Sequence, residues 1–238
     1  MKKALLFLSL SSFAVANTLN IAAAANISYP LNELKQKFEK LHPDIKLNVN
    51  TGASGSFNAQ IKNGANYDVF LSANMEFAKD LEELTKNQAI TYAKGKLILF
   101  SAKKKPNLDD LKTASCIAIA NPNTAPYGKA AKEVLNQIPN SSNIITATNI
   151  SATLLQATKA CGYAFVAASS VEQIKELGFS DENILKIDDK LYEPILQGMI
   201  ITSKEKNAKV FYDFILSPDA KEIFNKYGYE WARFKTRF

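Results

Sequence analysis

Histidine and cysteine are scarce in this 238-residue sequence, which has one histidine, His42, and two cysteines, Cys116 and Cys161. A single histidine excludes an imidazole metal cluster and a metal–histidine catalytic centre. His42 precedes a proline at the end of a helical pattern, where a solvated loop side chain is the ordinary outcome. Phosphate-binding loops of the GxxxxGK[ST] and GxGxxG types are also missing. These absences favour a binding protein over an enzyme, with neither a cofactor nor a catalytic metal.

The sequence has more basic than acidic residues, but the basic residues are not clustered. Lysine and arginine number 29 against 23 acidic residues, which gives a formal net charge of +6. The lysines are scattered along the chain instead of forming a basic patch interleaved with aromatic side chains, so no nucleic-acid partner is expected.

The N-terminus carries the only long apolar run. Met1-Lys-Lys precedes apolar and small residues from Ala4 to Ala14, and Ala14-Val-Ala16 ends the run before Asn17. A charged start, an apolar stretch too short to span a bilayer and a small-x-small site are typical of a secretory signal peptide. We therefore predict a signal peptide over residues 1–16 and an exported mature chain. No cysteine follows closely, so no lipid anchor is expected.

Short apolar runs alternate with helical patterns along the rest of the chain. The predicted strands are 18–25, 45–49, 67–72, 97–101, 116–120, 144–148, 163–167, 192–196 and 199–202. The predicted helices are 30–41, 74–84, 129–137, 171–177, 208–216 and 219–227, with shorter ones after residues 56 and 149. This order predicts α/β architecture with mixed, mostly parallel sheets flanked by helices. We expect two lobes, the first made of residues 17–98 and 200–238 and the second of residues 99–199.

Several of the turns that lead from a strand into a helix are rich in hydrogen-bond donors. One small-residue loop, 50–56, presents N–H groups and hydroxyls at a helix N-terminus, where the macrodipole favours an anion. Taken alone, such a loop is usually a capped turn. Similar turns recur at Ala25-Asn26, Ala53-Ser54, Tyr127-Gly128 and Ile150-Ser151, and none contains an acidic residue. If they converge, the resulting cavity suits a fully deprotonated oxyanion and penalises one that carries a proton, such as phosphate.

Seven short motifs are spread over the mature chain. They are Asn26 after an alanine run, Gly52-Ala-Ser-Gly-Ser56, Asp68-Val-Phe-Leu-Ser-Ala73, Tyr92-Ala-Lys-Gly-Lys-Leu97, Ala118-Ile-Ala-Asn-Pro122, Ala125-Pro-Tyr-Gly128 and Lys226-Tyr-Gly-Tyr229. Together they resemble the periplasmic molybdate-binding proteins of ABC importers. The resemblance implies a type II periplasmic-binding-protein fold, with two lobes joined by a two-strand hinge. It also implies a periplasmic monomer that binds molybdate or tungstate between its lobes and delivers it to a membrane permease.

The resemblance implies a set of ligand-binding residues as well. These residues are Ala25, Asn26, Ser54, Tyr127 and Ile150. Backbone N–H groups would supply most of the donors, together with the Asn26 amide and the Ser54 hydroxyl. Molybdenum would enter as the oxyanion, with no direct protein ligand. The chain departs from some relatives at Asn26, where several have serine, and at Ala167, where some offer a tyrosine hydroxyl.

Two other functions stay open from the sequence. A receptor for sulfate, thiosulfate or another small oxyanion would use the same fold and donors, and only the size of the cavity would exclude sulfate. A secreted transferase or hydrolase on a similar two-lobed frame would need a base or nucleophile in the cleft, and Ser54 has no histidine to activate it.

The two cysteines lie at comparable places in the predicted second lobe. Cys116 begins one strand and Cys161 directly precedes another. If the two strands are neighbours in a parallel sheet, a disulfide is feasible, since it requires a Cα separation of about 4.4–6.8 Å. Two buried free thiols are the alternative.

Overall fold

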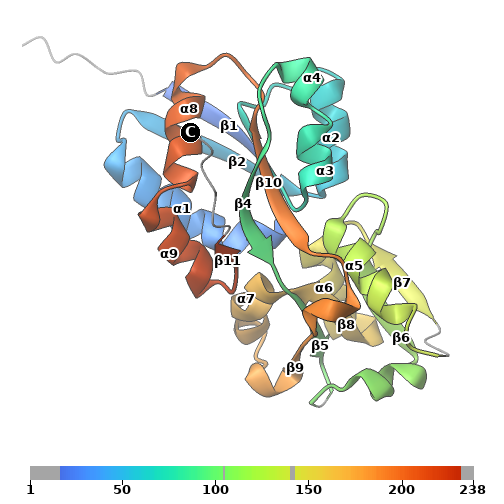
Figure 1. Cartoon of the computed structure of the whole chain (residues 1–238). Helices are drawn as coiled ribbons and strands as arrows, with labels where there is room; N and C mark the ends of the chain where they lie inside the picture. Colours follow the sequence, from blue (N-terminus) through green and yellow to red (C-terminus); the bar gives the residue numbers. More distant parts are fainter. Residues whose placement is uncertain (1–16, 104, 140–142, 232–238) are drawn as a thin grey trace, which may run out of the picture.

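The computed structural model describes residues 17–103, 105–139 and 143–231, so the predicted signal peptide over residues 1–16 lies outside the described part. Two α/β lobes lie beside each other, each built on its own sheet (Figure 1). In the described ranges, no helix combines the length and the apolar character that crossing a membrane requires.

The first lobe contains a six-stranded sheet in the order β11-β4-β10-β3-β1-β2. Its strands are β1 (Asn17–Ala24), β2 (Ile45–Gly52), β3 (Val69–Ser72), β4 (Ile90–Gly95), β10 (Ile195–Ile201) and β11 (Glu230–Trp231). Strand β1 runs parallel to β2 and β3, whereas β10 is antiparallel to both β3 and β4.

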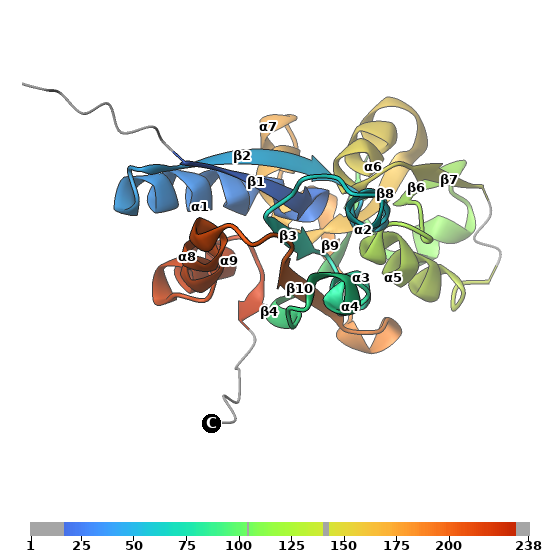
Figure 2. The same cartoon turned by 90° about the horizontal axis from the view of Figure 1, so that it is seen from above.

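Helices cover both faces of this sheet, as Figure 2 shows from above. They are η1 (Ala25–Ile27), α1 (Ser28–Leu41), α2 (Ser54–Lys62), α3 (Met75–Lys79), α4 (Glu82–Thr85), α8 (Lys206–Ile215) and α9 (Pro218–Lys226). Ile21 packs in one apolar cluster with Phe38 and Phe211, while its neighbour Ala22 packs in another with Phe57. The alternation of side chains along a strand thus places β1 between two apolar layers.

The second lobe contains a five-stranded sheet in the order β7-β6-β8-β5-β9. Its strands are β5 (Leu97–Ser101), β6 (Cys116–Ala120), β7 (Ile144–Ala147), β8 (Gly162–Ala167) and β9 (Ile184–Lys186). Its helices are η2 (Leu108–Lys112), α5 (Pro126–Leu135), α6 (Ile150–Gln156), η3 (Ala157–Cys161), η4 (Ala168–Ser170), α7 (Val171–Glu176), η5 (Asp181–Asn183) and η6 (Asp189–Leu191). Mixed sheets flanked by helices were predicted for both lobes, and this prediction is confirmed. The expectation that the sheets are mostly parallel is corrected, because β4, β5 and β10 make only antiparallel pairings.

The described chain crosses between the lobes twice. One residue, Lys96, separates β4 in the first sheet from β5 in the second, and the return runs from β9 to β10. The boundaries expected at 98/99 and 199/200 fall inside β5 and β10, so the sheets place both crossings a few residues earlier. A strand belongs to the lobe whose sheet it pairs with, and the pairing partners of β5 and β10 are distant in the sequence. The sequence alone therefore misplaced the boundaries.

Two details of the predicted strands were wrong. The runs 192–196 and 199–202 predict two strands, but one strand, β10, covers the last two residues of the first run and most of the second, with a register shift between Gln197 and Gly198. A Cβ on Gly198 would lie 2.7 Å from the carbonyl oxygen of Asn74, the residue before α3. Position 198 of β10 therefore has no room for a side chain. Strands β4, β9 and β11 were not predicted at all.

The disulfide prediction is confirmed. Strands β6 and β8 are parallel neighbours, with Cys116 opposite Gly162. Cys116 and Cys161 form a disulfide across a Cα separation of 4.8 Å. The bond joins the N-terminal ends of the two strands, away from the ends that lead into α5 and η4.

Removing this disulfide is expected to destabilise the protein. The bond closes a loop with a sequence separation of 45 residues, for which loop-closure entropy predicts a loss of about 4 kcal/mol in the free energy of unfolding. Urea denaturation of the Cys116→Ala/Cys161→Ala variant beside oxidised wild type would measure the loss, with reduced wild type as the control. Equal unfolding free energies in all three samples would contradict the expectation.

Candidate anion-binding site between the lobes

A small cavity lies between the lobes, where strands of both sheets end and helices begin. Its lining residues are Ala24, Ala25, Asn26, Gly52, Ala53, Ser54 and Ala73 from the first lobe and Ala125, Pro126, Tyr127, Asn149 and Ile150 from the second. All five residues predicted for the site are among them, and each is at most 7% exposed. The structure therefore brings together, in one enclosed place, four strand-to-helix turns that are far apart in the sequence.

Three of the helices that begin at this lining have no side-chain cap. The residues that precede η1, α2 and α5 are Ala24, Ala53 and Ala125, whose side chains cannot cap a helix. The first N–H groups of these helices therefore lack the usual side-chain acceptor. Asn149, which precedes α6, does cap its helix by accepting from Ala152 N. The small alanine side chains also leave room for a ligand to approach the backbone closely.

The Ser54 hydroxyl is oriented by a contact inside the first lobe. Its Oγ accepts a hydrogen bond of 2.9 Å from the backbone N–H of Ala73, which follows β3. Ser54 is 1% exposed and does not cap its own helix with its side chain. Because the oxygen already accepts this bond, its proton is available for donation to an acceptor in the cavity.

The Asn26 amide has a different role from the one expected. Its Nδ2 donates to Gln197 Oε1 at 2.8 Å and to the Tyr229 hydroxyl at 2.7 Å. Gln197 Nε2 in turn lies 3.2 Å from the carbonyl oxygens of both Ala73 and Ile195, which fixes which end of each amide is the donor. Both Asn26 amide hydrogens are thus engaged inside the protein, and the Tyr127 hydroxyl, 3.5 Å from Nδ2, shares one of them. The expectation that this amide donates to the anion is corrected, and the backbone N–H of Asn26 is left as its possible donor.

Gln197 and Tyr229 are the residues that sequence reasoning missed. Gln197 is fully buried in the otherwise apolar strand β10. A polar residue within an apolar run of the sequence could have indicated a buried hydrogen-bonding role. Tyr229 belonged to a motif that supported the resemblance, but no role could be read from it.

Direct contacts hold the two lobes together around the cavity. Gly55 N donates to Thr124 O at 2.9 Å, and Ser169 Oγ donates to Asn26 O at 2.5 Å. Farther out, the Tyr29 hydroxyl donates to the Glu176 carboxylate. The lobes are therefore closed on each other in this structure.

The Tyr127 side chain crosses the gap between the lobes. Its hydroxyl oxygen lies 3.5 Å from Asn26 Nδ2, and a Cβ built on Gly95 would lie 2.0 Å from the same oxygen. Burial and the neighbouring Tyr229 hydroxyl raise the pKa of Tyr127 well above its ordinary value, and burial raises the pKa of Tyr229 as well. Both phenols are therefore neutral at physiological pH. None of the described residues that line the cavity is ionised.

Comparison with known proteins identifies the family. The family model described as bacterial extracellular solute-binding protein matches residues 19–230. This chain belongs to that family. Among solved structures, the periplasmic molybdate-binding protein of Azotobacter vinelandii aligns with a TM-score of 0.81 and 29% identity, over 90% of this chain and 100% of that one. The predicted two-lobed type II fold is thereby confirmed.

Sequence relatives of this solute-binding protein agree with the structural likeness. The molybdate-binding protein ModA of Azotobacter vinelandii is 35% identical over 239 residues, which cover 92% of either chain. The protein of the same name from Rhodobacter capsulatus is 34% identical over 241 residues, which cover 94% of this chain and 92% of the relative. The resemblance to periplasmic molybdate-binding proteins that the motifs suggested is confirmed.

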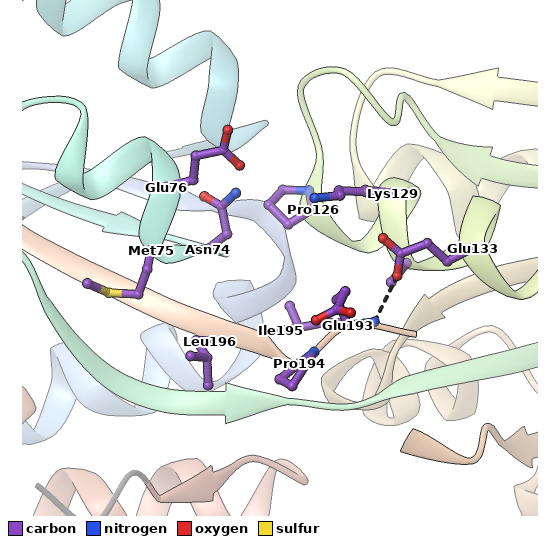
Figure 3. A pocket seen from close by; sticks show the side chains of 11 residues that line it. Asn74, Met75, Glu76, Pro126, Lys129, Glu133, Glu193, Pro194, Ile195 and Leu196 are labelled. Atoms are coloured by element: carbon purple, nitrogen blue, oxygen red, sulfur yellow. Dashed lines mark hydrogen bonds between the residues drawn. The ribbon is translucent and has the colours of Figure 1, made fainter. Parts of the chain in front are cut away.

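A second groove of this solute-binding protein opens beside the cavity and is shown in Figure 3. Its charged side chains are Glu76, Lys129, Glu133 and Glu193, and Glu133 Oε2 accepts from Glu193 N at 2.8 Å. Three carboxylates against one ammonium group make this groove unfavourable for a dianion. No group of three or more histidine, cysteine or acidic side chains that could hold a metal ion occurs among the described residues. The donor-lined cavity is therefore the candidate site.

Proposed function

We propose that this solute-binding protein is a periplasmic receptor that binds molybdate, and also tungstate, between its lobes and delivers it to the permease of an ABC importer. One observation carries the proposal: Ala25, Asn26, Ser54, Tyr127 and Ile150 line one buried, uncharged cavity. The named function of the two ModA relatives supports the choice of ligand. We further propose that residues 1–16 are removed on export and that the mature protein acts as a monomer without a lipid anchor.

Hydrogen bonds alone supply enough free energy for such a complex. Each bond to a charged group contributes about 1.5–3 kcal/mol, so about six or seven such bonds would contribute roughly 9–21 kcal/mol, compared with the roughly 8–12 kcal/mol of a micromolar to nanomolar complex. The surplus offsets the removal of water from the dianion and the closing of the lobes. Because Ser54 lies in one lobe and Tyr127 and Ile150 in the other, the anion binds the closed form better and shifts the equilibrium toward it.

Two properties of the cavity would select the ligand. If only N–H and O–H donors face the anion, the proton of hydrogen phosphate is left without an acceptor, which costs binding free energy; this requires Asn26 Oδ1, a buried oxygen with no partner among the described residues, to point away from the anion. Sulfate is also a tetrahedral dianion, so it can be excluded only if the donors are too far apart for the smaller ion. A sulfate or thiosulfate receptor is therefore the alternative that the binding experiment must address.

A hydrolase or transferase on this frame has less support. The Ser54 hydroxyl accepts from a backbone N–H, and the described lining of the cavity includes no histidine, carboxylate or lysine to act as its base. We therefore propose binding without chemistry.

Thermal unfolding in the presence of four anions tests the function. At a ligand concentration about 1,000 times Kd, binding adds about 4 kcal/mol to the free energy of unfolding, or about 8–16 °C in Tm for a protein of this size. We expect such shifts with molybdate and tungstate, and shifts within error with sulfate and phosphate at equal concentration. An equal shift with sulfate would overturn the assignment, and calorimetric titration of dialysed protein would then identify the preferred anion.

A further inference from the structure

A buried polar cluster behind the cavity joins the two lobes. In the first lobe it consists of Asn26, Gln197 and Tyr229, which we name the closure socket; they are held together by the two Asn26 amide bonds. Two residues of the second lobe enter it, Tyr127 from α5 and Ser169 from η4. All five residues are at most 4% exposed, so the contacts are shielded from water.

We propose that Tyr127 and Ser169 are positioning residues whose docking in the closure socket stabilises the closed form by the same amount whichever anion is bound. This inference rests on the proposed function and deepens it. It assigns part of the affinity to contacts between the lobes instead of contacts with the ligand.

Only the closed form can make these contacts. Ser169 Oγ donates to Asn26 O at 2.5 Å, and the Tyr229 hydroxyl lies 3.0 Å from the same carbonyl oxygen and 3.1 Å from Ser169 Oγ. When the lobes separate, Ser169 and Tyr127 leave with the second lobe. The bonds among Asn26, Gln197 and Tyr229 stay intact, because all three belong to the first. The socket is therefore preformed, which lowers the ordering cost of closure.

Two residues connect the socket with the anion cavity. Asn26 and Tyr127 both line the cavity, while their side chains meet in the socket. Closing onto an anion and docking in the socket therefore happen together. A contact made only in the closed form raises the fraction of binding-competent molecules, and it changes the apparent affinity for every ligand by the same factor.

Calorimetric titration of Tyr127→Phe and Ser169→Ala with molybdate and with tungstate tests the proposal. One buried hydrogen bond is worth about 0.5–1.5 kcal/mol, so each variant should raise Kd about 2- to 12-fold, by the same factor for both anions. The anion-free Tm should stay close to wild type, because the open form lacks these contacts. Tyr92→Phe is the matched control. Tyr92 is a fully buried tyrosine whose hydroxyl has no hydrogen-bond partner among the described residues. The Tyr92→Phe variant should therefore bind both anions with the Kd of wild type.

The outcomes separate the two proposals. Wild type that binds neither anion would overturn the proposed function, and this inference with it. Wild type that binds while both variants keep its Kd would overturn the inference alone. A factor that differs between molybdate and tungstate would show that the residues act on the ligand and would also overturn it. A fall in anion-free Tm with Kd unchanged would reduce their role to ordinary fold stability.

Discussion

Replacing Ser54 by alanine is expected to weaken molybdate binding about 10- to 100-fold. The variant loses one hydroxyl donor to a dianion, and a hydrogen bond to a charged group is worth about 1.5–3 kcal/mol. It also leaves the backbone N–H of Ala73, which is 3% exposed, without the acceptor that Ser54 Oγ provides. An unpaired buried N–H costs about 1–3 kcal/mol, so the free energy of unfolding should fall in the absence of anion too. Calorimetric titration and urea denaturation measure the two effects separately.

The neighbouring Ser56 provides a matched control for this variant. It lies in the same helix, α2, but its side chain is exposed. Ser56→Ala should therefore keep both the affinity and the stability of wild type. Wild-type affinity in Ser54→Ala would mean that the turn before α2 is only a structural turn, and the candidate site would lose its first-lobe hydroxyl.

Gly95→Ala is expected to hold the lobes apart. The added Cβ would lie 2.0 Å from the Tyr127 hydroxyl oxygen and 2.9 Å from Cζ of the same ring, which is 1% exposed. Tyr127 belongs to the second lobe and moves away when the lobes open, so the clash acts mainly on the closed form. Overpacking of this kind costs about 1–3 kcal/mol, which corresponds to a rise in Kd of about 5- to 100-fold. Small-angle scattering with molybdate should show a larger radius of gyration than for wild type.

A second substitution removes the shorter of the two close contacts with the tyrosine. In Gly95→Ala/Tyr127→Phe the hydroxyl oxygen at 2.0 Å is gone, and the nearest ring carbon is the atom at 2.9 Å. The double variant should therefore bind molybdate more tightly than Gly95→Ala, although Tyr127→Phe alone weakens binding. Additive losses would instead mean that Gly95→Ala distorts the first lobe, where Gln197 Nε2 lies 3.0 Å from the new Cβ.

Local patterns in the sequence predicted much of this architecture. Strands β1 and β6 match the predicted strands 18–25 and 116–120 to within one residue at either end, and α9 covers nearly all of the predicted helix 219–227. Donor-rich turns could also be located in the sequence, although only the resemblance to the molybdate-binding proteins implied that they form one site. The residues of these turns sit where strands lead into helices, and parallel strands in one sheet bring such turns to the same edge.

Long-range contacts account for what the sequence did not reveal. The Asn26 amide was expected to face the ligand, but its partners, Gln197 and Tyr229, lie 171 and 203 residues away. Strand β4 has few apolar residues and owes its assignment to pairing with β10 and β11. Pairing across such distances leaves no periodic signal, so neither feature could be derived from the sequence.

The position of β10 in the first sheet determines the order in which the lobes can be completed. It lies between β3 and β4, which are neighbours in sequence but do not pair with each other. The second sheet, by contrast, is made entirely of strands β5 to β9, one continuous stretch of chain. A chain made from its N-terminus therefore contains every strand of the second lobe before the centre of the first exists. Tyr229 comes later still, so a prematurely ended chain can contain every residue predicted for the site and still lack one wall of the socket behind it.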